Sequence, residues 1–88
     1  MNYREILRNL VAFPTVSSDS NLALIDYVRD WLESCGFTTR CQYNAEGDKA
    51  NLIARLGPER DGGILLAGHT DVVPVADQDW NSDPFLLA

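Results

Sequence analysis

Apolar residues recur at helical spacing in two stretches of the first half of the chain. In residues 2–13 they fall every three or four positions and stop before a proline, which disfavours helix in the residue preceding it. Residues 21–35 have one apolar and one charged face, and Gly36 stands where helices commonly end in a left-handed conformation. Asp19 or Ser20 is a candidate cap for this second stretch. The pattern predicts two amphipathic helices.

Three later stretches have the composition and patterning of β-strands. Residues 37–43 alternate between two faces, and residues 51–56 can pair back on them across a turn containing Asn, Gly and Asp. Residues 64–68 are apolar on both faces, as in a strand covered on both sides. The sequence therefore predicts an α/β fold with two helices followed by a three- to four-stranded mixed sheet.

The last part of the chain departs from this regular pattern. After Val73 an Asp- and Pro-rich loop follows, and the sequence ends on the apolar, strand-like residues 85–88. Two helices alone would not cover both faces of the predicted sheet. We expect residues 1–88 to be the amino-terminal portion of a longer α/β domain.

Charge and composition narrow the classes of partner. The 88 residues include 13 acidic and 7 basic side chains, for a formal net charge of -6, and the basic residues are scattered. This balance argues against nucleic acid and anionic membranes as partners. The start of the chain resembles neither a signal peptide nor a membrane span, so a cytoplasmic location is expected. Cys35 and Cys41 are interpreted as a buried helix residue and a strand residue rather than zinc thiolates.

The single histidine, His69, follows the predicted strand 64–68, and Asp71 comes two positions later. Side chains at positions i and i+2 of an extended chain point to the same side, so an imidazole and a carboxylate would lie together at the strand end. Such an imidazole can bind a divalent metal while the carboxylate orients it. The triplet alone is weak evidence, because a lone histidine is more often structural and a zinc site needs three or four protein ligands.

Other candidate residues have simpler structural interpretations. The serines between residues 17 and 20 are more simply helix caps than nucleophiles. Trp31 is expected in the core, while Trp80 and Phe85 are expected to pack their loop against the domain. The remaining possible metal ligands are more simply turn-forming or solvated carboxylates, namely Asp77, Asp79 and Asp83.

Longer motifs add a resemblance to a known family. "LLAGHTDVVPV" followed by "DWNSDPF" resembles the first metal motif of the M20 family of zinc-dependent amidohydrolases and peptidases. "FPTVSSDSNLALIDYVRDWLESCGF" and "KANLIARLGP" precede it in the order that family shows, so the resemblance covers nearly the whole chain. The form W-x-x-D-P-F at Trp80 to Phe85 resembles the branch that deacetylates the α-nitrogen of ornithine more than the branch that desuccinylates succinyl-diaminopimelate.

The resemblance implies a function that composition and spacing do not. It implies that the chain is the amino-terminal part of an M20-type zinc-peptidase catalytic domain, with His69 as a ligand of a two-zinc site and Asp71 as its catalytic-site aspartate. Co²⁺ is a possible substitute for Zn²⁺. The implied reaction is hydrolysis of an N-acetylated amino acid, a small-molecule substrate, to acetate and ornithine for arginine synthesis, through a metal-bridging water deprotonated by a glutamate.

The same resemblance implies that much of the machinery lies elsewhere. The further metal ligands, the catalytic glutamate and a dimerisation domain would follow downstream, so the 88 residues alone are expected to be inactive and a homodimer is expected only of the full-length protein. Two alternatives stay open: another M20 deacylase or peptidase, or a non-catalytic α/β module that binds a protein partner through an exposed apolar sheet edge.

Overall fold

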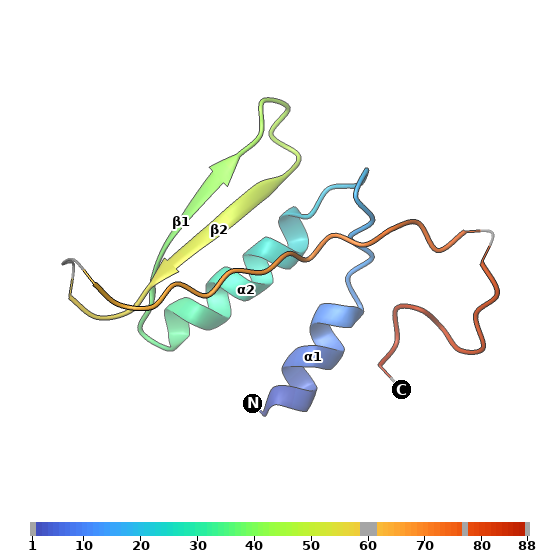
Figure 1. Cartoon of the computed structure of the whole chain (residues 1–88), viewed down its shortest axis with the longest axis horizontal. Helices are drawn as coiled ribbons and strands as arrows, with labels where there is room; N and C mark the ends of the chain where they lie inside the picture. Colours follow the sequence, from blue (N-terminus) through green and yellow to red (C-terminus); the bar gives the residue numbers. More distant parts are fainter. Residues whose placement is uncertain (1, 59–61, 77, 88) are drawn as a thin grey trace.

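The computed structural model describes residues 2–58, 62–76 and 78–87. It contains four regular elements in the order α1 (Tyr3–Val11), α2 (Leu22–Ser34), β1 (Thr38–Tyr43) and β2 (Ala50–Arg55), shown in Figure 1. All four lie within two residues of the ranges that the sequence predicts. The α/β class is therefore confirmed.

Local hydrogen bonds explain where the helices begin and end. The Asn2 side chain accepts from the backbone N–H of Glu5 at 3.0 Å and caps α1. Asn21 stands at the cap position of α2 but makes no side-chain cap hydrogen bond, and the expected cap residue Ser20 accepts from the N–H of Leu22 at 3.3 Å through its hydroxyl. Gly36 has φ 95°, the left-handed conformation expected after a helix.

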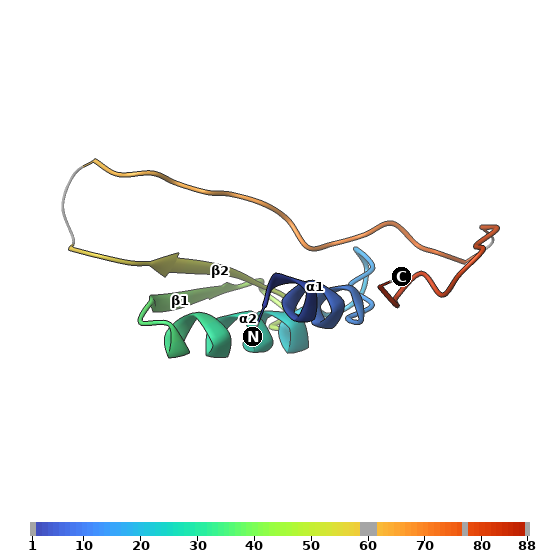
Figure 2. The ribbon, with the colours of Figure 1, turned by 90° about the horizontal axis from the view of Figure 1, so that it is seen from below.

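The two strands form an antiparallel hairpin that packs on α2. Cys41 pairs with Leu52 in the register of the hairpin, and alternate side chains on both strands are at least partly shielded from solvent. Figure 2 shows α2 along one side of this hairpin. The core is correspondingly thin, because one face of a two-stranded sheet supplies few apolar side chains.

The core lies between α2 and the start of β2. Leu24, Ile25 and Ala50 are its buried residues, with exposed fractions of 2%, 7% and 5%. The Phe13 ring, which follows α1, lies against the Tyr27 ring of α2, with the two centroids 5.7 Å apart. Other apolar side chains pack around this cluster while remaining partly exposed: Leu10, Leu22, Val28, Cys41 and Leu52.

Three expectations about buried or paired residues are wrong in detail. Residues 64–68 form no strand in the described part of the chain, where the sheet has two strands and not three or four. Cys35 is exposed at the end of α2 rather than buried. Trp31 is only half-buried, because a single hairpin does not enclose the whole apolar face of α2.

The missing third strand has a physical reason. Ile64, Leu65 and Leu66 are each about 90% exposed. Figure 2 shows residues 62–68 passing extended on the side of the hairpin opposite α2. An apolar pattern gives a segment the capacity to form a covered strand, but the strand exists only where another strand edge and covering layers meet it. No described residue provides that pairing.

The Asn21 side chain joins the two halves of the fold, and we expect its loss to destabilise the chain. Its Oδ1 accepts from the backbone N–H of Ala50 and its Nδ2 donates to the Ala50 carbonyl, both at 2.9 Å. Asn21→Ala leaves the backbone N–H and carbonyl of the buried Ala50 without these hydrogen bonds. This loss should lower the free energy of unfolding by about 1–3 kcal/mol. Urea denaturation followed by circular dichroism measures the change.

The matched control is Asn9→Ala. Asn9 donates to the Tyr27 hydroxyl at 3.0 Å in an exposed contact, so its replacement should cost less than about 1 kcal/mol. Equal losses for the two variants would show that the Asn21 contacts do not join α2 to β2 energetically.

Candidate functional site

A parallel bridge between Val16 and Val72 brings the loop after α1 beside the segment that carries the histidine. The N–H of Val72 donates to the Thr15 carbonyl and the N–H of Ser17 donates to the Val72 carbonyl, both at 2.9 Å. Residues 69–72 are thus fixed against residues 15–17, more than fifty positions away in the sequence. This pairing determines where the candidate site lies.

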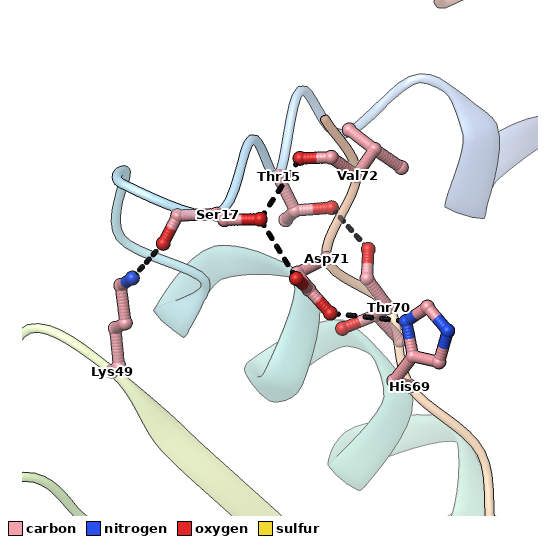
Figure 3. Close-up of polar contacts among 7 residues, drawn as sticks. All are labelled: Thr15, Ser17, Lys49, His69, Thr70, Asp71 and Val72. Atoms are coloured by element: carbon pink, nitrogen blue, oxygen red, sulfur yellow. Dashed lines mark hydrogen bonds and ion pairs between the residues drawn. The ribbon is translucent and has the colours of Figure 1, made fainter. Parts of the chain in front are cut away.

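Ser17, Asp71 and His69 form a continuous hydrogen-bonded chain at this bridge (Figure 3). The Ser17 hydroxyl donates to Asp71 Oδ2 at 2.8 Å, and the other carboxylate oxygen, Oδ1, lies 3.0 Å from His69 Nδ1. The expectation that His69 and Asp71 lie side by side is therefore confirmed. The serine contacts the carboxylate and not the imidazole, which differs from a nucleophile activated by a histidine base.

Two further contacts hold the backbone around the hydrogen-bonded side chains of Ser17, Asp71 and His69. The buried Thr15 hydroxyl donates to the Thr70 carbonyl at 2.7 Å, between the histidine and the aspartate. The Lys49 ammonium group donates to the Ser17 carbonyl from the turn before β2 (Figure 3). Ser17, Thr15 and Lys49 are the residues that the sequence reading missed as parts of a site, because their contacts span 32 to 55 positions.

The polar atoms of the site are open to solvent. The side chains of His69 and Asp71 have exposed fractions of 84% and 58%. The pKa of the Asp71 carboxyl lies below its usual value, chiefly because the Ser17 hydroxyl donates a hydrogen bond to its charged form and secondarily because His69 also contacts it. Asp71 is thus held as a carboxylate, the form that can accept a hydrogen bond from a protonated ring nitrogen of His69.

The arrangement fits one ligand position of a metal site. A carboxylate can only accept hydrogen bonds, so we assign the proton of a neutral His69 ring to Nδ1, which leaves the lone pair on Nε2. Nε2 belongs to a largely exposed ring and is therefore accessible to a metal ion. Within residues 2–58, 62–76 and 78–87, no group of three His, Cys, Asp or Glu side chains is placed to hold a metal ion.

The acidic loop after the bridge is mainly a structural element. Asp83 Oδ1 accepts from the N–H of Phe85 at 2.9 Å, and the Asp83 carbonyl accepts from the N–H of Leu86. This is the turn-forming role predicted from the sequence. Trp80 is 51% exposed, so the expectation that it packs the loop down is not met, whereas Phe85 is half-buried. Asp77 lies outside the described residues.

A hollow of about 340 Å³ adjoins the histidine. Its walls are mostly apolar and come from α1, the start of α2, the bridge and the loop near Phe85, with His69 and Thr70 contributing the polar edge. Volumes in this range are typical of small-molecule sites. The residues that line it include Leu10, Val11, Phe13, Leu24, Val72 and Pro84.

Comparison with known proteins finds relatives among curated sequences. No protein-family profile matches the chain, and no solved structure matches it significantly. Among curated proteins, acetylornithine deacetylase of Pasteurella multocida is 42% identical over 93 residues, covering 98% of this chain and 24% of that enzyme. The chain resembles acetylornithine deacetylases along almost its entire length.

Two further relatives agree. Acetylornithine deacetylase of Proteus mirabilis is 43% identical, covering 94% of this chain and 23% of that enzyme. Acetylornithine deacetylase of Erwinia tasmaniensis is 41% identical, covering 98% of this chain and 24% of that enzyme. The chain thus spans about a quarter of the length of the acetylornithine deacetylases that it matches, consistent with an amino-terminal portion of that enzyme.

Nothing in the described residues indicates a membrane span. No helix between residues 2 and 58, or in 62–76 and 78–87, is long and apolar enough to cross a bilayer.

Proposed function

We propose that this chain is the amino-terminal portion of a zinc-dependent amide hydrolase that converts N2-acetyl-L-ornithine to L-ornithine and acetate. The observation that carries the proposal is the similarity of 94–98% of the chain to curated acetylornithine deacetylases at 41–43% identity. The hydrogen-bonded His69 and Asp71 pair supports it, since that pair lies in the motif that suggests a metal site.

In this proposal His69 is a metal ligand, and Asp71 fixes the orientation of the His69 ring. Asp71 holds the proton on Nδ1, so that Nε2 presents its lone pair outward in a fixed direction. A zinc ion bound there supplies Lewis-acid polarisation of the amide carbonyl and a water of lowered pKa, and Co²⁺ is a possible substitute. The remaining ligands and the general base belong to the part of the enzyme that the matched quarter does not cover.

The substrate and setting follow from the same proposal. The substrate is a small N-acetylated amino acid. We place the reaction in arginine synthesis in the cytoplasm, with a homodimer formed only by the full-length enzyme. Neither nucleic acid nor membrane is a proposed partner, in keeping with the net charge of -6.

A substrate panel tests this function. The native polypeptide that carries this sequence should hydrolyse N2-acetyl-L-ornithine faster than N-succinyl-L,L-diaminopimelate, with peptide mass mapping establishing its full extent. The isolated 88-residue chain should release no acetate, because one histidine cannot hold a catalytic metal pair. Faster desuccinylation would assign the chain to another branch of the family. Metal-dependent deacetylation by the isolated chain would contradict its dependence on further residues.

The exposed run of Ile64, Leu65 and Leu66 favours a second candidate, a module that associates with protein through this segment. Three consecutive apolar side chains with exposed fractions near 90% form an exposed hydrophobic segment that favours association with another protein surface. This candidate requires no catalysis by the chain.

Light scattering across a concentration series tests this second candidate. Leu65→Lys places a charge in the exposed run and should abolish the concentration-dependent association expected of the unmodified 88-residue chain. Leu86→Lys is the control, since Leu86 is also exposed, at 60%, but lies outside the run. Association that both variants disrupt equally, or that neither disrupts, would eliminate this segment as the contact.

A further inference from the structure

We propose that Ser17 is a positioning residue for the candidate metal ligand, acting through Asp71. This inference rests on the proposed function for its consequence and on geometry for its basis. The Ser17 hydroxyl and the His69 ring bind different oxygens of one carboxylate, at 2.8 and 3.0 Å. Asp71 is thereby held from both sides, so its rotation about the last side-chain bond is restricted and the ring follows the carboxylate.

The backbone around Ser17 prepares the hydroxyl for this contact. The Ser17 N–H donates to the Val72 carbonyl at 2.9 Å, and the Ser17 carbonyl accepts from the Lys49 ammonium group. The residue is therefore tied to both the histidine segment and the hairpin (Figure 3). With its backbone fixed in this way, Ser17 has only the rotation of its short side chain left to lose when the hydroxyl binds the carboxylate.

The hydroxyl has two acceptors within reach and one proton to donate. Asp71 Oδ2 is at 2.8 Å and the Val72 carbonyl at 3.2 Å, and the carboxylate is both nearer and charged. The proton is therefore directed to Asp71. Restraint matters here because Asp71 and His69 are largely exposed, so water competes for the carboxylate in the absence of a fixed donor.

Outer partners of metal-binding histidines commonly affect both ligand orientation and metal affinity. Loss of such a partner typically lowers metal affinity by about 10–100-fold. Ser17 is one step further out than Asp71, so we expect Ser17→Ala to weaken zinc binding about 10-fold, at the lower end of that range. Ser17→Thr keeps the hydroxyl and should restore most of the affinity.

Two measurements test the proposal separately from catalysis. In the native polypeptide after removal of its metal, the ring ¹⁵N chemical shifts of His69 report which nitrogen carries the proton. Ser17→Ala should decrease the Nδ1-protonated fraction at constant pH, Ser17→Thr should preserve it, and Ser18→Ala should leave it unchanged as the neighbouring-hydroxyl control. Zinc affinity of the native polypeptide, measured by competition with a chromogenic chelator, should follow the same order.

The outcomes separate the two proposals. A changed tautomer in Ser17→Ala with no zinc bound by any variant would support positioning and overturn the metal function. Zinc bound equally by the unmodified protein and by Ser17→Ala, with identical ¹⁵N shifts, would overturn positioning and leave the metal function standing. Equal losses in Ser17→Ala and Ser17→Thr would also overturn positioning, since the hydroxyl would then not be the active group.

Discussion

Leu24→Ala should remove a large share of the stability of the chain. Leu24 is 2% exposed and belongs to a core with only three buried apolar residues in the described part of the chain. Removing a buried leucine side chain costs about 2–5 kcal/mol, through lost burial and the cavity that remains. A domain of this size has a total stability of only about 4–13 kcal/mol, by the usual range per residue. Chemical denaturation monitored by circular dichroism measures the loss.

The control for this prediction is Leu56→Ala. Leu56 is 64% exposed just after β2, so the same chemical change should alter the free energy of unfolding by about 0.5 kcal/mol or less. Comparable losses at the two positions would show that the cluster around Leu24 is not the core that stabilises the fold.

His69→Ala should produce the second large effect, on metal binding. If Nε2 of this ring is a zinc ligand, its removal should lower zinc affinity by more than about 100-fold, beyond the 10–100-fold typical of outer partners. Competition with a chromogenic chelator measures this in the native polypeptide. The ring is 84% exposed, so the folded structure should survive the change, and circular dichroism should be unaltered.

Asp83→Asn provides the matched control for the metal prediction. Asparagine removes the charge of a candidate acidic ligand but keeps an oxygen that can accept from the N–H of Phe85. Zinc affinity should stay within about twofold, well below the effect of losing an outer partner. A loss as large as that of His69→Ala would make Asp83 a ligand and contradict its structural role.

The elements that sequence predicts correctly are those determined by near neighbours. The spacing of apolar residues in α2 and the glycine at position 36 act over a few residues, and both are observed. The run 64–68 has an equally clear pattern, yet it is unpaired among the described residues. Strand formation requires a partner that the local sequence does not specify.

The contrast between local patterns and long-range contacts also explains which parts of the candidate site the sequence predicts. His69 and Asp71 are two positions apart, so their proximity follows from the alternation of an extended chain. The Ser17 contact spans 54 positions and depends on the bridge between Val16 and Val72, which no periodicity indicates. The sequence offers a local explanation of the serines near residue 17 as helix caps. The Ser17 hydroxyl instead donates to Asp71, a contact that this local explanation hides.

The most direct test of the central claim is N2-acetyl-L-ornithine hydrolysis by the native polypeptide that carries this sequence, assayed before and after chelation of its metal. We expect activity to disappear with the metal, to return when Zn²⁺ is added, and to be absent from a folded His69→Ala variant. Deacetylation that persists without metal, or that survives in His69→Ala, would contradict the account.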